Sequence, residues 1–162
     1  MNLFKTIKRI NFKSFWQLVL LGIKNPFFIY PTLNATRECL AVSTKHYGRL
    51  HYQNTPANAF RHAFWNYLIA KKCTKWSEKT DYILNWVKNI TDWHENAFRN
   101  REMARKMDLH NNHVGRWLFN KHKDKKIEEV IQIVLELTKK SIKITKQVSL
   151  EKHQFSLVHL TD

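Results

Sequence analysis

The segment NTPANAFRHAFWNYLIAKKC, Asn54–Cys73, carries the clearest helix signal in the chain. Thr55 is a typical N-cap residue, and Pro56 suits the first helical position because its missing N–H is not needed there. The whole chain has only three Gly and three Pro in 162 residues. That is little punctuation for the many turns of a β-sandwich. We therefore expect a helix from Pro56 to about Lys75, in an all-α fold.

Further helices are expected on both sides of this segment. Apolar residues at three-and-four spacing predict one over Phe12–Ile23, and Gly48 ends a second that starts at about Pro31. The segment Asn25–Thr32, NPFFIYPT, is expected to be an extended break. The other predictions are a helix over Ser77–Phe98, a shorter one ending near Lys121, one capped by Asp124, and a tail over 148–162 that forms a short strand or a docked extension.

These segments predict an all-α single compact helical bundle of about six helices. By length, residues 1–162 form one domain, because 162 residues can bury one core. Within it, residues 1–53 supply basic, amphipathic helices that pack on or extend the core. Residues 54–121 hold the motif-bearing part.

The charge balance is strongly basic, with 28 Lys and Arg against 13 Asp and Glu and a formal charge of +15. Such an excess predicts a negatively charged partner: nucleic acid, an anionic lipid surface or a phosphorylated compound. Lysine enrichment as background from an AT-rich genome is the alternative. Two cysteines, Cys39 and Cys73, are too few for a disulfide scaffold or a thiolate zinc site.

The N-terminus has a basic start and an apolar patch over Phe15–Ile23. The patch contains Gln17, lacks a small-residue cleavage site nearby and is far shorter than the roughly 20 residues of a spanning helix. We expect a helix docked on the core with solvated lysines. An interfacial membrane helix is the alternative. We expect the protein to lie in the cytoplasm or at the membrane periphery. Export without an evident cleavable signal is the alternative.

The segment MDLHNNHVGR, Met107–Arg116, is polar where the pattern would otherwise favour a buried helix. On a helix, Asp108, Asn111 and Asn112 form one stripe, with Gly115 a turn further on. His110 lies about 200° from Asp108 at 3.6 residues per turn, and it pairs with His113 instead. A site here would use one of these two sets and not both.

Two more polar groups stand out in the neighbouring helices. Asn58, Arg61 and His62 lie in the first turns of the helix after Thr55, with Trp65 and Asn66 one turn on. The pair His94–Glu95 lies near the end of the next helix.

Together, NAFRHAFWN, HE and MDLHNNHVGR resemble an uncharacterised bacterial domain family with the pattern N/D-A-F-R-H-A-x-W-N, H-E, M-D-L-x-N-N-x-V-G-R. The resemblance covers residues 54–118, and domains of this family look like the C-terminal cargo of secreted polymorphic-toxin proteins. No reaction follows from it. This chain departs from the family in the segment NAFRNREMARK, which replaces a Gly/Pro-rich loop. The positions that it marks are Asn58, Arg61, His62, Trp65, Asn66, His94, Glu95, Asp108, Asn111, Asn112, Gly115 and Arg116.

The residue types predict chemistry at a metal ion. Carboxylates and carboxamide oxygens suit Mg²⁺, Mn²⁺ or Ca²⁺, and imidazoles with carboxylates suit Zn²⁺. The expected cofactor is one such divalent ion, with no organic cofactor. The metal ligands that we predict are His94, Glu95, Asp108, Asn111 and Asn112. The predicted catalytic residues are His62, Glu95, Asp108 and Arg61, and the predicted substrate-binding residues are Arg61, Asn58, Trp65, Asn66 and Arg116.

We therefore expect a metal-assisted hydrolase that acts on a phosphoester of an anionic substrate, with His62 as general acid or base. A lipid-linked phosphate is favoured over nucleic acid, and a toxin-like effector fits the resemblance. A metal-free acyl or glycan hydrolase is one alternative. The other is a non-catalytic basic helical module that binds nucleic acid or an anionic membrane surface.

Overall fold

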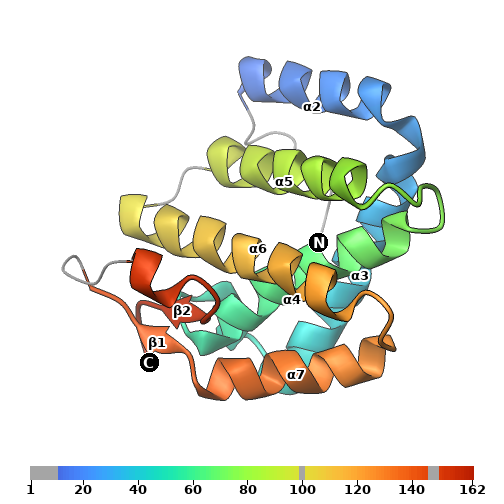
Figure 1. Ribbon diagram of the computed structural model, residues 1–162. Coiled ribbons are helices and arrows are strands. Elements are labelled where there is room, and N and C mark those ends of the chain that lie inside the picture. The colour runs from blue at the N-terminus through green and yellow to red at the C-terminus, as the bar shows by residue number, and fades with distance from the viewer. Residues whose placement is uncertain (1–10, 99–100, 146–149) are drawn as a thin grey trace.

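The computed structural model describes residues 11–98, 101–145 and 150–162, and these fold mainly into helices (Figure 1). The predicted all-α class with about six helices is confirmed. None of the described helices has the length and hydropathy that crossing a bilayer requires. The helices are α2 (Phe12–Lys24), α3 (Pro26–Tyr47), α4 (Pro56–Cys73), α5 (Thr80–Ala97), α6 (Glu102–His122) and α7 (Ile127–Lys139).

Helix α4 is the centre of the fold, in contact with α3, α5, α6 and α7. Most of its residues are buried, and Phe60, Phe64, Tyr67 and Leu68 are fully so. Its buried polar residues His62 and Asn66 face the neighbouring helices and not water. The segment that signalled the fold most clearly is therefore the one that the other helices surround.

Helix α6 is long, and the segment Met107–Arg116 lies in its middle. The expected shorter helix was wrong because the polar segment does not interrupt the helix. Close packing against α4 explains the glycine at position 115. A Cβ at this position would lie 2.2 Å from the backbone oxygen of Ala63 on α4. The glycine thus permits the close approach of α4 and α6 that brings their polar residues together.

Two other predicted boundaries were wrong. The segment Asn25–Thr32 is not extended, because α3 begins at Pro26, which occupies the first helical turn, and continues through Pro31. Burial of Phe28 and Pro31 against the core outweighs the proline's helix-breaking tendency. The N-cap of α7 is Lys126 and not Asp124. Its backbone N–H donates to the side chain of Glu129 at 3.2 Å.

The tail folds back on the start of α4. Strand β1 (Ile142–Lys143) pairs in parallel with β2 (Val158–His159). Between the two strands in sequence lies a 3-10 turn, η2 (Leu150–His153). The backbone oxygen of Asn54, which follows the 3-10 turn η1 (Leu50–Tyr52), accepts hydrogen bonds from the N–H groups of Leu160 and Thr161. The tail is therefore both a short strand and a docked extension.

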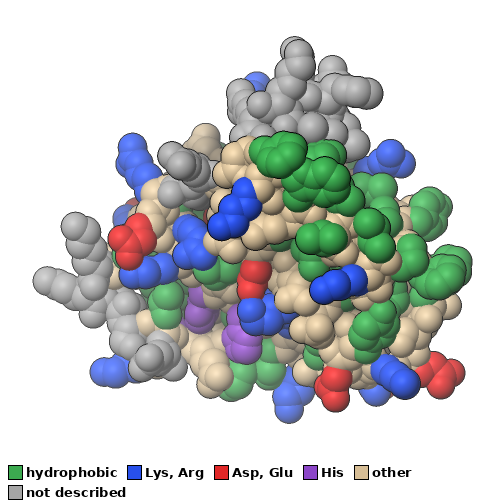
Figure 2. Space-filling model, turned by 90° about the horizontal axis from the view of Figure 1, so that it is seen from above, with side chains coloured by type: hydrophobic (Ala, Val, Ile, Leu, Met, Phe, Trp, Pro, Cys, Tyr) green, Lys and Arg blue, Asp and Glu red, His purple; other side chains and the backbone are tan. Residues whose placement is uncertain are grey.

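Helix α2 docks through a different face from the one that the sequence favoured. Ser14 is buried and Leu18 and Leu21 pack on the core, and the indole N–H of Trp93 on α5 donates to the Ser14 carbonyl at 2.8 Å. The apolar stripe predicted to dock on the core is exposed instead, over Phe12, Phe15, Trp16, Leu20 and Ile23. Figure 2, which looks down on α2, shows these hydrophobic side chains at the surface.

Candidate metal centre

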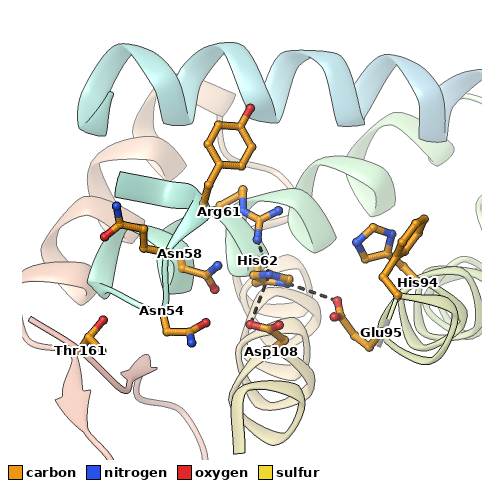
Figure 3. A pocket seen from close by; sticks show the side chains of 11 residues that line it. Asn54, Asn58, Arg61, His62, His94, Glu95, Asp108 and Thr161 are labelled. Atoms are coloured by element: carbon orange, nitrogen blue, oxygen red, sulfur yellow. Dashed lines mark hydrogen bonds and ion pairs between the residues drawn. The ribbon is translucent and has the colours of Figure 1, made fainter. Parts of the chain in front are cut away.

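Three consecutive helices each contribute one ionisable side chain to a buried cluster: His62 from α4, Glu95 from α5 and Asp108 from α6 (Figure 3). His62 Nδ1 lies 3.5 Å from Glu95 Oε1, and His62 Nε2 lies 3.4 Å from Asp108 Oδ1. One ligand atom from each residue lies within 4.8 Å of the other two. The three residues are 5% exposed or less, so the cluster is inside the protein.

The contacts of His62 show which of its ring nitrogens carries the proton. The Arg61 guanidinium can only donate, and its Nη2 lies 2.7 Å from His62 Nε2, so Nε2 is the acceptor. The proton then lies on Nδ1, which donates to Asn112 Oδ1 at 3.0 Å. Nε2, whose lone pair accepts from Arg61, also lies 3.4 Å from Asp108 Oδ1.

A carboxamide network holds the cluster from behind. Asn112 Oδ1 also accepts from Asn66 Nδ2 at 2.7 Å, and Asn112 Nδ2 donates to Glu95 Oε1 at 3.2 Å. Asn66 Oδ1 in turn accepts from Thr91 and from Arg116, whose Nη1 lies 3.0 Å away. Each of these side chains is therefore fixed by its neighbours, which orients His62 and Glu95.

Burial dominates the electrostatics of the cluster. It lowers the pKa of His62 well below its usual value, and the positive charge of Arg61 lowers it further. Burial and then the charge of Asp108 raise the pKa of Glu95 to about 8. The His62–Glu95 contact is therefore not an ion pair at neutral pH, because the imidazole is neutral and the carboxyl keeps its proton.

The cluster opens into a polar cleft of about 570 Å³. Two buried atoms on its wall, Asn58 Oδ1 and Arg61 Nε, have no hydrogen-bond partner among the described residues. Buried polar atoms normally have partners, so a polar ligand in the cleft would satisfy them. The cleft is lined by Tyr52, Gln53, Asn54, Asn58, Arg61, His62, His94, Glu95, Phe98, Asp108 and Thr161.

The structure brings some of the predicted site residues together and separates others. The cleft gathers Asn58, Arg61, His62, His94, Glu95 and Asp108. Trp65 packs its ring against His94 and donates to Thr36, and Asn66 and Arg116 belong to the network behind the cluster. These three are not on the cleft wall, so our assignment of them to substrate binding is corrected to a supporting position.

Two predicted metal ligands also lie elsewhere. Both ends of the Asn111 carboxamide are used by the backbone of Val158, at 2.9 and 3.0 Å, so Asn111 holds the tail and does not face the cluster. His94 packs its ring on Trp65 and Phe98 and lines the cleft, whereas His62 supplies the imidazole of the cluster. Burial, with the charge of Arg61, lowers the pKa of His94 to about 4.

Some residues of the cleft come from outside the motifs and were not predicted. Gln53 and Asn54 lie between η1 and α4, and Thr161 lies in the tail. Docking of the tail on Asn54 brings Thr161 to the cleft. No periodicity or motif marks these residues, so only long-range contacts reveal them.

Comparison with known protein families assigns the chain to one of them. A family described as a domain of unknown function, DUF6973, matches residues 19–143. This chain belongs to that family. The DUF6973 match agrees with the resemblance to an uncharacterised domain family, and it spans the helices that build the cluster. No curated protein and no solved structure matches the chain.

The cluster has the donor set of a divalent metal site. One imidazole and two carboxylates are ligands for Zn²⁺ and other first-row ions. A metal-bound histidine normally donates its second ring N–H to an oxygen that fixes the ring, and the bond from His62 Nδ1 to Asn112 has this form. A cation here would also offset the repulsion between Asp108 and Glu95.

Proposed function

We propose that this DUF6973 protein is a metal-dependent hydrolase of phosphoesters and that His62, Glu95 and Asp108 hold the ion. The observation that carries the proposal is the convergence of these three side chains on the floor of a polar cleft. Burying two carboxyl groups side by side is costly, and a bound cation would offset the repulsion between Asp108 and Glu95. The assignment moves His62 from the general acid or base that we expected to a metal ligand.

The surroundings of the cluster suit an anionic substrate. Arg61 lines the cleft beside His62, and its Nε is a buried donor without a partner among the described residues. A guanidinium matches the geometry of a phosphate, to which it donates two parallel hydrogen bonds. Asn58 Oδ1, an acceptor that is also without a partner there, would suit a hydroxyl or N–H donor on another part of the substrate. We assign phosphate binding to Arg61 and not to Arg116.

The reaction that we propose is hydrolysis. The oxygen of a water molecule forms a bond to phosphorus, the ester P–O bond breaks, and the leaving oxygen takes up the proton that the water releases. A divalent ion in such a site supplies an activated water and stabilises the charge that develops on the phosphoryl oxygens. Asn112 keeps His62 and Glu95 in place. An ion on His62 Nε2 would take the place of the hydrogen bond from Arg61, whose guanidinium would then orient the phosphate.

The experiment combines metal analysis with an activity screen. Purified protein would be stripped with chelator, reloaded separately with Zn²⁺, Mn²⁺ and Mg²⁺, and assayed on bis-p-nitrophenyl phosphate, single-stranded DNA and phosphatidylglycerol. We expect at least one ion to restore turnover. We also expect His62→Ala, Glu95→Gln and Asp108→Asn to reduce it by two orders of magnitude or more, about 2.7 kcal/mol in barrier height.

Matched controls are available on the surface of the same helices. His113→Ala on α6 and Asp81→Asn on α5 remove an exposed imidazole and an exposed carboxylate, and both should leave turnover unchanged. The alternative, a non-catalytic basic module, rests on the charge of +15. It predicts salt-sensitive binding of DNA or anionic lipid that all three cluster variants retain, with no metal-dependent turnover. That result would reject the hydrolase.

A further inference from the structure

An apolar surface covers the end of the molecule that α2 and the start of α3 form. On α2 the stripe of Phe12, Phe15, Trp16, Leu20 and Ile23 is exposed, with Phe12 at 76% and Ile23 at 70%. Monomeric proteins rarely leave a contiguous group of large apolar side chains in water without a use for it. We call this surface, together with its continuation on α3 and Trp76, the α2–α3 face.

The α2–α3 face continues across the turn between the two helices. Phe27, Ile29, Tyr30 and Leu33 on α3 are exposed, with Phe27 at 68% and Tyr30 at 70%. Ile29 Cδ1 lies 3.3 Å from the position of a Cβ on Gly22, so the two helices join without a gap. Trp76, after α4, stacks on Phe27 with 5.6 Å between ring centroids and extends the face. Figure 2 shows hydrophobic side chains grouped over this part of the surface.

The face is held on its inner side by hydrogen bonds and ring contacts to the rest of the fold. Trp93 of α5 bonds to the backbone of Ser14, and the Tyr82 hydroxyl donates to Asn25 Oδ1 at 2.7 Å. Phe28, between exposed Phe27 and Ile29, is buried against Trp86. The apolar residues that stabilise the fold therefore differ from those that form the face, and the exposed ones are available for a partner.

The charges beside the face point to an anionic partner. The first 37 residues contain no Asp or Glu, and Lys13 and Lys24 on α2 are exposed. At 3.6 residues per turn, both lysines lie about 20 to 40° beyond Leu20 at one edge of the stripe. In sequence, this stretch contains the basic residues Lys5, Lys8, Arg9, Lys13, Lys24 and Arg37.

We propose that the α2–α3 face docks on an anionic lipid surface, with the aromatic and aliphatic side chains in the headgroup region and the lysines against the lipid phosphates. Exposed aromatic and aliphatic residues on one face, flanked by lysine, are the features of an interfacial helix. A second copy of the chain fits less well, because pairing two faces would bring together two molecules of charge +15. Since no residue of α2 or α3 lines the cleft, this proposal does not depend on the hydrolase.

The test is sedimentation of the full chain with vesicles. We expect binding to mixed phosphatidylglycerol and phosphatidylcholine vesicles, weakened by salt, and little binding to pure phosphatidylcholine. Trp16→Gln combined with Ile23→Gln should lower the partition coefficient about tenfold or more, because two apolar anchors are lost. Lys13→Gln combined with Lys24→Gln should lower it about tenfold or more on mixed vesicles, because two cations that attract the anionic surface are lost.

The control is an equal substitution outside the face. Leu50→Gln combined with Phe155→Gln removes two similarly exposed apolar side chains, at 51% and 45%, and should leave binding unchanged. Circular dichroism and the unfolding temperature verify that each variant is folded. Equal binding of wild type and the Trp16/Ile23 variant would overturn the proposal, and so would failure to bind mixed vesicles. Sedimentation velocity that shows a dimer abolished by that variant, without vesicle binding, would assign the face to a second copy.

Discussion

His62 Nδ1 donates to Asn112 Oδ1 across 3.0 Å, from the second turn of one buried helix to the middle of another. The bond joins residues 50 positions apart in sequence. It fixes the imidazole, whose Nε2 accepts from Arg61 and lies 3.4 Å from Asp108 Oδ1. The candidate metal centre thus depends on a residue that need not touch the ion.

The first prediction concerns Asn112. Asn112→Ala removes the acceptor of His62 and the donor to Glu95, so the affinity for Zn²⁺ or Mn²⁺ should fall about 10- to 100-fold, as for other residues that orient metal ligands. Isothermal titration calorimetry measures this change. Asn120→Ala, on the exposed side of the same helix, should bind as the wild type does. Equal affinities in the two variants would show that the bond does not orient a metal ligand.

The second prediction compares two glycines. Gly115→Ala would place a Cβ 2.2 Å from the Ala63 carbonyl oxygen, which is backbone and cannot move aside. We expect the free energy of unfolding to fall by about 1–3 kcal/mol or more, because α4 and α6 must separate. Gly22→Ala meets only the flexible end of Ile29 at 3.3 Å and should be neutral or slightly stabilising. Urea unfolding of both variants tests the difference, and equal losses would contradict it.

The third prediction is the pH dependence of the metal-free protein. Because the pKa of Glu95 rises from 4.5 to about 8 on folding, the folded state holds a proton there that the unfolded chain releases. This stabilisation is complete below pH 4.5 and is lost as the pH rises to about 8. The lowered pKa values of His62 and His94 act in the opposite direction, but only below their usual 6.5.

The unfolding temperature without metal should therefore fall between about pH 6.5 and 8. Glu95→Gln, which keeps the shape and loses the titration, should remove this fall, whereas Glu128→Gln on the exposed side of α7 should not. Saturating Mn²⁺ should also remove it in the wild type, because the ion displaces the proton. Thermal scans across this range measure the slope. The same slope in Glu95→Gln would assign it to another group.

The fourth prediction concerns Asn111. Asn111→Ala leaves the N–H and C=O of Val158 without their buried partners, which costs about 1–3 kcal/mol for each unsatisfied group. Hydrogen exchange at residues 157–160 should become faster, while metal affinity stays unchanged because Asn111 does not face the cluster. A loss of metal affinity with the tail still protected would restore Asn111 as a ligand.

The sequence predicted where the helices lie along the chain better than which face of each helix packs on the core. The N-cap and proline at Thr55–Pro56 and the core spacing of α5 predicted two helices close to their observed bounds. The stripe on α2 was recognised as apolar but assigned to the core, since periodicity shows that a face exists and not what covers it. Local sequence rules predict an extended piece that ends at Pro31, because they do not include the burial of α3 against the core.

The candidate site was predicted as a set of residue types. Helical spacing put Asp108, Asn111 and Asn112 on one stripe, yet Asn112 faces His62 and Asn111 faces the tail. Residues next to each other on a helix point about 100° apart, so the neighbouring element decides which one enters the site. For the same reason the cluster contains His62 and not the predicted ligand His94, which is next to Glu95 in sequence.

The sequence by itself determined the helical class, the basic charge and the identities of His62, Glu95 and Asp108, because periodicity, composition and motif are local properties of the chain. Tertiary structure alone decided that these three side chains meet, that Thr161 reaches their cleft and that the stripe of α2 faces water. Each of these results depends on the packing of segments far apart in sequence. The close approach of α4 and α6 at Gly115 is the contact that makes the first of them possible.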